Sequence, residues 1–398
     1  MRTRPACEMQ KARGAVFGLN YGWEHPLWFA QAGEEAHETY GFTRQPWWHA
    51  VGREARMLRQ RAGIIDISNF AKTRVSGPGA EEWLNALFAN RMPHGVGRSC
   101  LTPLIGARGG VAGDFTVTRL GEDEFWVIGG GAAERFHQRF FRQVPLPEGT
   151  TVESLTERVC GFNVAGPRAR DLLACLTEAD LSNDAFPFFR SRRIRVAGVD
   201  CVALRVSFTG DLGWELHCVA KDQVTLYTAL LGAGVPLGAG PVGSRALMSL
   251  RLEKGYGSWG RDYSPEYWPH ESGLAGLIRP DKDFLNRPAW EAVARQAPRE
   301  RMVLLDVAAQ EADASGGEPV FLPDGTPAGQ VSSGGYGHSV GRSLALAYLK
   351  AGVAGPGDRV HVAILGRAHE ARVLDRPPFD PEGRRLRGTV PDEALAGA

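Results

Sequence analysis

The chain has 398 residues, which is too long for one ordinary hydrophobic core and predicts two or three domains. Hydrophobic residues make up 43% and charged residues 23% of it, as in a globular protein that buries a core. The formal net charge of +1 argues against a nucleic-acid-binding protein and against attraction to an anionic membrane. We therefore expect neither nucleic acid nor a membrane among its partners.

The first part of the chain mixes helical and strand-like patterns. Residues 24–46 begin as aromatic, irregular sequence, and apolar residues then recur at helical spacing over residues 47–61. The next segment, GIIDIS at residues 63–68, predicts a short strand. The segment SGPGAEEWLNALF at residues 76–88 predicts a Gly-Pro turn followed by a helix. Residues 110–130 predict two strands joined as a hairpin at residues 121–124, and a helix follows over residues 131–144.

A second set of similar elements follows. The strand, Gly-Pro and helix pattern of residues 73–88 recurs in residues 159–176, VCGFNVAGPRARDLLACL. Further strands are predicted within residues 192–219, and another helix over residues 221–234. Two such units predict a duplicated α+β module with antiparallel sheets.

The C-terminal part has a different character. From Arg301 onward, short strands alternate with Gly, Pro and Asp turns, which predicts a small all-β barrel or sandwich. The Pro-rich segment from Pro377 onward is expected to be loosely ordered, and its Arg384 and Arg385 are candidates for binding a carboxylate of a ligand.

Several kinds of site and compartment are disfavoured by the sequence. The six cysteines are scattered without a C-x-x-C pair, which indicates reduced thiols, and no histidine lies at metal-ligand spacing, so we expect no metal. The Gly-rich segments fit neither a dinucleotide fingerprint nor a phosphate loop. The N-terminus lacks a signal-peptide core and no run approaches about 18 apolar residues, so we expect a cytoplasmic protein.

Three charged residues at the ends of predicted elements are candidates for chemistry. Asp114 follows glycines that let another group approach the backbone, and the alternative explanation is a carboxylate that caps its own turn. Glu215 lies in an apolar strand, where a buried carboxylate is costly without a partner, unless the strand is an edge and the residue faces water. Arg245 opens an apolar helix, either toward a ligand or as a surface or capping cation. The residues alone leave these alternatives open.

Six ordered motifs resemble the folate-binding family of the glycine-cleavage aminomethyltransferase, and they are most similar to the C-terminal folate module of dimethylglycine and sarcosine dehydrogenases. They are GIIDISNFAK, GDFTVTRL, FTGDLGWEL, GSRALMSLRLEKGYGSWGRD, PHESGLAGLIR and SGGYGHSVGRSLALAYL. The resemblance implies an α+β fold with two intertwined modules and antiparallel sheets in residues 1–295. It also implies a small C-terminal β-barrel in residues 296–385, a flexible tail in residues 386–398, and a central tetrahydrofolate cavity.

The resemblance also implies roles for the three charged residues. Asp114 matches the acid beside the N5/N10 edge of folate, where a carboxylate stabilises a developing cation and relays a proton. Glu215 matches the carboxylate that binds the pterin ring, because it can accept hydrogen bonds from the 2-amino group and the neighbouring ring N–H together. Arg245 matches the arginine at the start of the family's helix motif.

Aromatic residues complete the implied site. Phe70 occupies a position that lines the folate cavity, and Phe208 stands where close relatives carry a tyrosine whose hydroxyl reaches the folate. Tyr256 and Trp259 lie in an aromatic segment that is expected either to contact a methylated substrate or to pack between domains.

Three functions are compatible with this resemblance. The first is a tetrahydrofolate-dependent transferase or demethylase that moves a methyl or methylene group from a small methylated donor to tetrahydrofolate. The second is a folate-binding subunit that works with a separate flavoprotein, a flavin-dependent N-methyl amine dehydrogenase. The third is a non-catalytic folate-binding protein, which the Phe208 departure favours and the retained charged residues disfavour.

Overall fold

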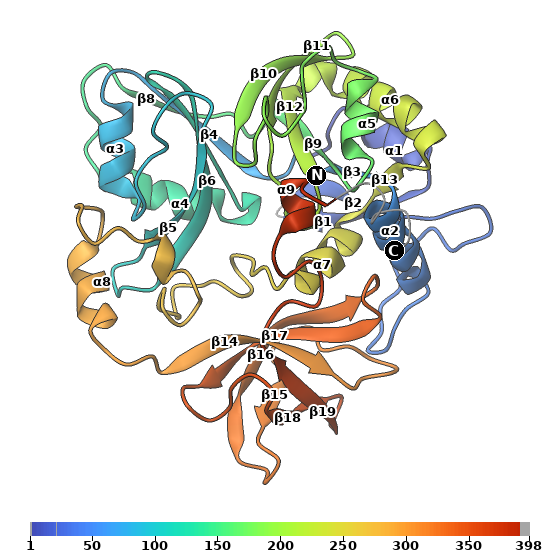
Figure 1. Cartoon of the computed structure of the whole chain (residues 1–398), viewed down its shortest axis with the longest axis vertical. Coiled ribbons are helices and arrows are strands. Elements are labelled where there is room, and N and C mark those ends of the chain that lie inside the picture. The colour runs from blue at the N-terminus through green and yellow to red at the C-terminus, as the bar shows by residue number, and fades with distance from the viewer. Residues whose placement is uncertain (1, 21, 391–398) are drawn as a thin grey trace.

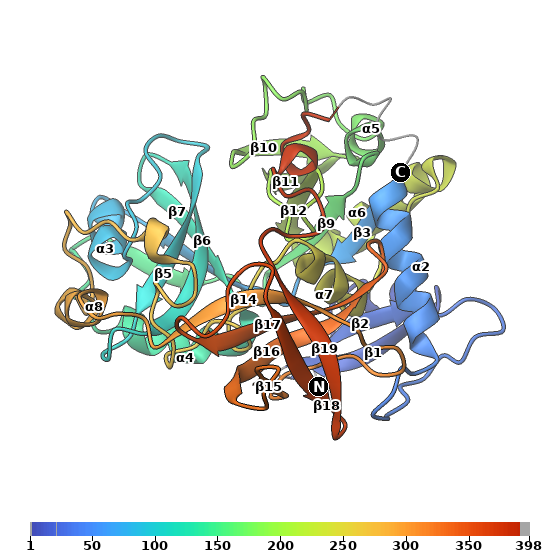
Figure 2. The same cartoon turned by 60° about the horizontal axis from the view of Figure 1, so that its bottom comes forward.

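The computed structural model describes residues 2–20 and 22–390, which form three groups of elements (Figure 1). Two groups are α+β units that lie side by side, and the third is a β-barrel beneath them. Helix α7 (Ser244–Glu253) lies where the groups meet (Figure 2). It packs against α2 (Trp47–Gln60), β2 (Trp23–Phe29) and the barrel strands β16 (Pro327–Gly337) and β17 (Arg342–Lys350).

The first α+β unit is built on a five-stranded antiparallel sheet in the order β5-β6-β7-β4-β8. The expected hairpin is confirmed, since β6 and β7 pair with Gly121 opposite Glu124. Helix α3 buries Trp83 and Leu84 against this sheet, as its apolar spacing predicts. The elements are β4 (Ala71–Ser76), α3 (Ala80–Leu87), β5 (Ser99–Ile105), β6 (Val111–Gly121), β7 (Glu124–Gly129), α4 (Glu134–Phe141) and β8 (Thr151–Ser154).

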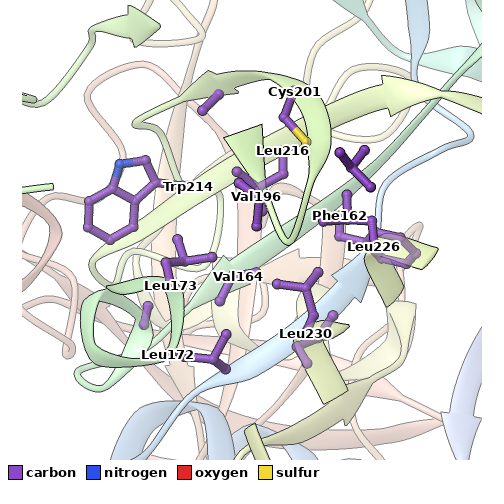
Figure 3. Packing of buried hydrophobic residues seen from close by; sticks show 14 of the residues in the cluster. Phe162, Val164, Leu172, Leu173, Val196, Cys201, Trp214, Leu216, Leu226 and Leu230 are labelled. Carbon is purple, nitrogen blue, oxygen red and sulfur yellow. The ribbon is translucent and has the colours of Figure 1, made fainter. Parts of the chain in front are cut away.

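The second α+β unit has a six-stranded sheet in the order β10-β11-β12-β9-β3-β13. Its neighbours are antiparallel except for β13 and β3, which are parallel. The core forms where the leucines of α5 and α6 pack against sheet residues such as Val164 and Leu216 (Figure 3). The elements are α2 (Trp47–Gln60), β3 (Gly63–Asp66), β9 (Val159–Ala165), α5 (Ala169–Ala174), β10 (Ser191–Val196), β11 (Val199–Leu204), β12 (Gly213–Val219), α6 (Gln223–Gly234) and β13 (Gly240–Val242).

Two observations support the predicted duplication and intertwining. Strand β3 precedes the first unit in sequence, yet it pairs with β9 of the second unit, with Gly63 opposite Ala165. Each unit also joins a strand to a helix through a Gly-Pro turn with the same backbone geometry. The φ angle is 116° at Gly77 and 124° at Gly166, a region that side chains beyond glycine rarely adopt.

The N-terminal segment is more regular than its sequence suggests. The short helix α1 (Cys7–Lys11) is followed by a hairpin of β1 (Ala15–Asn20) and β2 (Trp23–Phe29). The expectation of irregular chain from residue 24 is therefore wrong as far as Phe29. Strand β2 carries Pro26, and Gly18 of β1 lies so close to Leu27 that a Cβ there would approach its side chain within 2.8 Å.

The C-terminal group is a closed barrel rather than a sandwich. Its strands follow the order β14-β17-β16-β15-β18-β19, and β14 closes it by pairing with both β17 and β19. Strand β17 is buried on both faces, one inside the barrel and one toward Leu252 of α7. The elements of the barrel are β14 (Glu300–Val307), β15 (Pro319–Phe321), β16 (Pro327–Gly337), β17 (Arg342–Lys350), β18 (Arg359–Ile364) and β19 (Arg367–Leu374), and the preceding helix α8 (Arg287–Ala294) lies beside the first α+β unit (Figure 1).

The segment after the barrel differs from the loose tail expected from Pro377. Residues 377–390 pack against the second α+β unit and include the one-turn helix α9 (Arg384–Arg387). Asp380 forms an ion pair with Lys254 at 3.1 Å, and Arg385 one with the buried Asp211 at 2.8 Å. Arg385 is therefore occupied by the protein and does not offer itself to a ligand. Residues 391–398 of the predicted flexible tail lie outside the described residues.

Candidate functional site

A cavity of about 1400 Å³ lies among the three groups of elements. Its volume exceeds the range of about 300–1,000 Å³ common for small-molecule sites, so it has room for a large ligand and a second reactant. The structure brings all seven residues of the predicted site to its wall: Phe70, Asp114, Phe208, Glu215, Arg245, Tyr256 and Trp259. They come from segments that are distant in sequence, so the fold is what assembles them.

Asp114 enters the cavity from β6 of the first sheet. Apart from its own backbone amide, its carboxylate has no hydrogen-bonding or ionic partner in the described part of the chain. Protein surrounds the group, and this loss of bulk water raises the pKa of Asp114 to about 6. A carboxylate with such a pKa can accept and release a proton near neutral pH.

Glu215 enters the cavity from β12 of the second sheet. It is not an edge-strand residue, because β12 lies between β11 and β9, opposite Leu204 and Asn163. Its Oε2 lies 3.2 Å from Nε2 of His217, two residues along the same strand and therefore on the same face. Burial lowers the pKa of His217, so the ring is neutral at pH 7 and can donate its N–H to the carboxylate.

The contact with His217 uses only part of the hydrogen-bond acceptor capacity of the Glu215 carboxylate. A carboxylate offers about four lone-pair positions, and His217 is its one hydrogen-bonding partner among residues 2–20 and 22–390. The remaining positions are available to a ligand with adjacent N–H donors. Sequence reasoning did not include His217, although the alternation of side chains along a strand could have indicated it.

Arg245 lies at the start of α7 and reaches the cavity wall. Its guanidinium forms an ion pair with Glu38 and lies 3.7 Å from the ring centroid of Trp47. Burial lowers the pKa of Arg245. The arginine is therefore partly buried and stacked against an aromatic ring rather than lying on the surface, and its charge is already paired with Glu38.

Phe70 is held in the turn between β3 and β4 by a buried lysine. Nζ of Lys72 donates hydrogen bonds to the backbone oxygens of Ser68 at 3.1 Å and of Phe70 at 2.9 Å. Burial lowers the pKa of Lys72 to about 8. The lysine thus fixes the turn that presents Phe70 and Asn69 to the cavity.

The aromatic residues predicted to meet a substrate lie on one segment, residues 254–274, which has little regular structure. Tyr256 stacks on Phe208 with ring centroids 6.1 Å apart, and Trp259 packs against His137 at 4.9 Å. Both line the cavity, so they do more than pack between domains. Nε1 of Trp259 is buried without a hydrogen-bond partner among the described residues.

A buried ion pair anchors this segment. Asp262 is fully buried and accepts hydrogen bonds from Arg251 at 2.8 Å and from Ser333 of the barrel at 2.6 Å. It also accepts one from the backbone N–H of Ser258 at 2.9 Å. Helix α7, the aromatic segment and the barrel are therefore joined at one carboxylate, which the sequence alone did not reveal.

Two further findings concern the described residues as a whole. Within residues 2–20 and 22–390 there is no group of three or more His, Cys, Asp or Glu side chains arranged to hold a metal ion. In the same part of the chain, every helix is too short or too polar to cross a lipid bilayer.

Comparison with known proteins agrees with the six motifs. The family model described as the GCVT N-terminal domain matches residues 6–282, and the glycine cleavage T-protein C-terminal barrel domain matches residues 300–380. Dimethylglycine dehydrogenase, mitochondrial, from Mus musculus is 34% identical over 374 residues, which are 93% of this chain and 43% of that protein. The chain thus spans less than half the length of the curated dehydrogenases it matches.

Shorter relatives match over their whole length. Aminomethyltransferase from Saccharopolyspora erythraea is 30% identical over 379 residues, which cover 94% of this chain and 97% of that protein. The crystal structure of glycine cleavage system aminomethyltransferase T from Bartonella henselae has a TM-score of 0.82 at 25% identity, covering 96% of this chain and 98% of that one. The chain therefore belongs to the glycine cleavage T-protein family of aminomethyltransferase-like enzymes.

Proposed function

We propose that this chain binds tetrahydrofolate in the central cavity and transfers to it a methyl group from a small methylated amine, or a methylene group from such an amine once it has been oxidised to the iminium or formaldehyde level. The observation that carries the proposal is the convergence of Asp114 and Glu215. These carboxylates come from two different sheets and face one cavity, and in the described structure neither forms an ion pair with a lysine or arginine, although Lys72 lies near enough to Glu215 to interact with its charge. Such groups are costly unless a ligand supplies donors or positive charge.

The residues present fit a reduced pterin. Glu215 has free acceptor positions, and His217 holds its carboxylate in place, so it can accept the two adjacent N–H donors of a pterin ring. Bound tetrahydrofolate would supply the nitrogen atoms that accept the one-carbon unit. Asp114, with a pKa of about 6, would hold the proton that is exchanged there and stabilise developing positive charge.

The donor class follows from the relatives and the cavity wall. The similar proteins include dimethylglycine dehydrogenase, sarcosine dehydrogenase and 4-methylaminobutanoate oxidase (formaldehyde-forming). Each of these enzymes is named after a substrate that is an N-methyl amine. The aromatic faces of Tyr256 and Trp259 and the negative charge of Asp114 would suit such a donor, which carries positive charge. We therefore place Tyr256 and Trp259 at the donor.

A second candidate function is that of a folate module supplied by a flavin-dependent dehydrogenase. It is favoured by one observation: the matched dehydrogenases continue well beyond the aligned region, which is 43% of the mouse protein. In that case the dehydrogenase would oxidise the N-methyl amine, and this chain would pass the released one-carbon unit to folate.

We also propose a reducing, cytoplasmic location. All six cysteines are unpaired, four of them buried, as is usual where thiols stay reduced.

One incubation separates these functions. The protein is mixed with tetrahydrofolate and N-methyl amines, with and without an N-methyl amine dehydrogenase, and folate products are identified by mass spectrometry. Methyl folate formed without the dehydrogenase supports the self-sufficient transferase, and methylene folate formed only with the dehydrogenase, which carries out the two-electron oxidation, supports the folate module. If tetrahydrofolate does not bind and no product forms in either arm, the proposal is wrong.

A further inference from the structure

Tyr263 is a second polar group near Asp114, and it belongs to the same aromatic segment as Tyr256 and Trp259. It lines the same cavity, from the aromatic segment of residues 254–274. Burial and the negative charge of nearby Asp114 both raise the pKa of Tyr263, so the phenol stays protonated at neutral pH. The other charged groups that act on it, Asp262 and Arg251, already form an ion pair with each other.

The position of the ring is fixed by its own turn. The backbone N–H of Tyr263 donates to Ser258 O at 3.1 Å, and the N–H of Gly260 donates to Tyr263 O at 2.8 Å. The neighbouring Asp262 anchors this turn to the barrel. The ring lies directly over Gly257, where a Cβ would come within 2.4 Å of Tyr263 Cζ. A tyrosine held this firmly presents its hydroxyl at one defined place.

The hydroxyl of Tyr263 has a proton to donate into the cavity. Its oxygen lies against the backbone of Gly257, whose N–H lowers the pKa of the phenol and so acts on the oxygen without using the hydroxyl proton. No hydrogen bond joins Tyr263 to Asp114 in the described structure, so a ligand can reach both groups. Phe208, in contrast, meets the cavity with a ring that has no hydroxyl.

We propose that Tyr263 is a further residue of the transfer site, whose hydroxyl donates a hydrogen bond to the one-carbon-carrying edge of bound folate, beside Asp114. This inference rests on the proposed function, because it assigns a contact to the folate that the cavity would hold. The donor hydroxyl and the acceptor carboxylate make a complementary pair, so a reactant between them is oriented from two sides.

The test uses a folate whose one-carbon unit is itself an acceptor. Affinities of the full chain for tetrahydrofolate and for 5-formyltetrahydrofolate are measured by calorimetry for wild type and Tyr263→Phe. The formyl oxygen accepts a hydrogen bond, whereas unsubstituted tetrahydrofolate offers a weaker acceptor. Tyr267→Phe is the matched control, since its hydroxyl comes from the same segment but binds Gln330 at 3.3 Å, outside the cavity wall.

We expect Tyr263→Phe to weaken 5-formyltetrahydrofolate binding by about 3- to 10-fold, to change tetrahydrofolate binding less, and to leave the melting temperature of the unliganded protein unchanged. Tyr267→Phe should alter neither affinity. Equal affinities of wild type and Tyr263→Phe for the formyl compound would overturn the inference, as would an equal loss for both folates. Failure of the wild type to bind either folate would instead overturn the proposed function.

Discussion

Replacing Asp114 with asparagine tests whether this carboxylate is kept in the cavity at a cost to stability. The pKa of Asp114 is raised to about 6, compared with about 3.9 for an exposed aspartate. A difference of about 2 pKa units corresponds to about 3 kcal/mol. Because the folded state binds this proton more tightly than the unfolded state, the free energy of unfolding falls as pH rises from about 4 to about 6. Above about pH 6 the carboxylate is charged in both states, and the full free-energy cost of burying its charge lowers the stability of the folded protein.

Asp114→Asn removes the charge and therefore the cost. The variant should match wild type in stability near pH 4 and exceed it by about 1–3 kcal/mol at pH 7.5, without folate, in urea denaturation. It should also transfer the one-carbon unit at least about tenfold more slowly, because the proton carrier is lost. Gained stability with lost turnover is the signature of a group retained for chemistry.

The control is Asp123→Asn, in the exposed turn between β6 and β7, which should leave both stability and turnover unchanged. The reasoning would be refuted if Asp114→Asn were no more stable than wild type at pH 7.5, or if its turnover were normal. The first result would mean that the cavity does not disfavour the charge, and the second that Asp114 takes no part in transfer.

Two other substitutions test the binding and the framework of the site. Glu215→Gln should weaken tetrahydrofolate binding at least about tenfold in calorimetry, because an amide cannot accept from two adjacent donors; normal affinity would remove Glu215 from pterin binding. Asp211→Ala should lower the free energy of unfolding by about 1–3 kcal/mol, because it leaves Arg385 without its counter-charge and leaves the buried Arg59 with Glu253 as its remaining carboxylate partner. A loss below about 1 kcal/mol in urea denaturation would show that this ion-pair network does not hold the C-terminal segment.

The elements that the sequence predicts well are those whose apolar spacing is uninterrupted. Helix α2 runs over Trp47–Gln60, one residue short of the predicted end, because its buried residues recur at helical intervals. The β1–β2 hairpin was not predicted, since Pro26 and Gly18 are both unfavourable in strands. That hairpin is stabilised by packing, with Trp28 fully buried against α2 and α7.

The sequence identified the residues that line the candidate site, but not the side chains with which those residues form ion pairs and hydrogen bonds. The motifs located Asp114, Glu215 and Arg245 because family resemblance is read directly from local sequence. Glu38, which pairs with Arg245, is 207 residues away in the chain, and no local pattern links the two. Tyr263 likewise owes its position to tertiary contacts of an irregular segment.

The C-terminal segment shows how composition can mislead. Its prolines indicated loose chain from Pro377, and its Arg384 and Arg385 were candidates for binding a carboxylate of a ligand. The structure instead gives Arg385 a buried carboxylate, Asp211, and gives the backbone oxygen of Arg387 a hydrogen bond from Arg205 at 2.8 Å. A Pro-rich segment is ordered where enough of its polar groups find fixed partners.

Binding of tetrahydrofolate to the purified chain tests the central claim most directly. Titration calorimetry should give one site per chain, and ligand at 100 times its dissociation constant should add about 2.7 kcal/mol to the free energy of unfolding. Asp114→Asn should retain this stabilisation, whereas Glu215→Gln should lose most of it. A wild-type protein that gains no stability from saturating tetrahydrofolate, and shows no binding heat, would contradict the account.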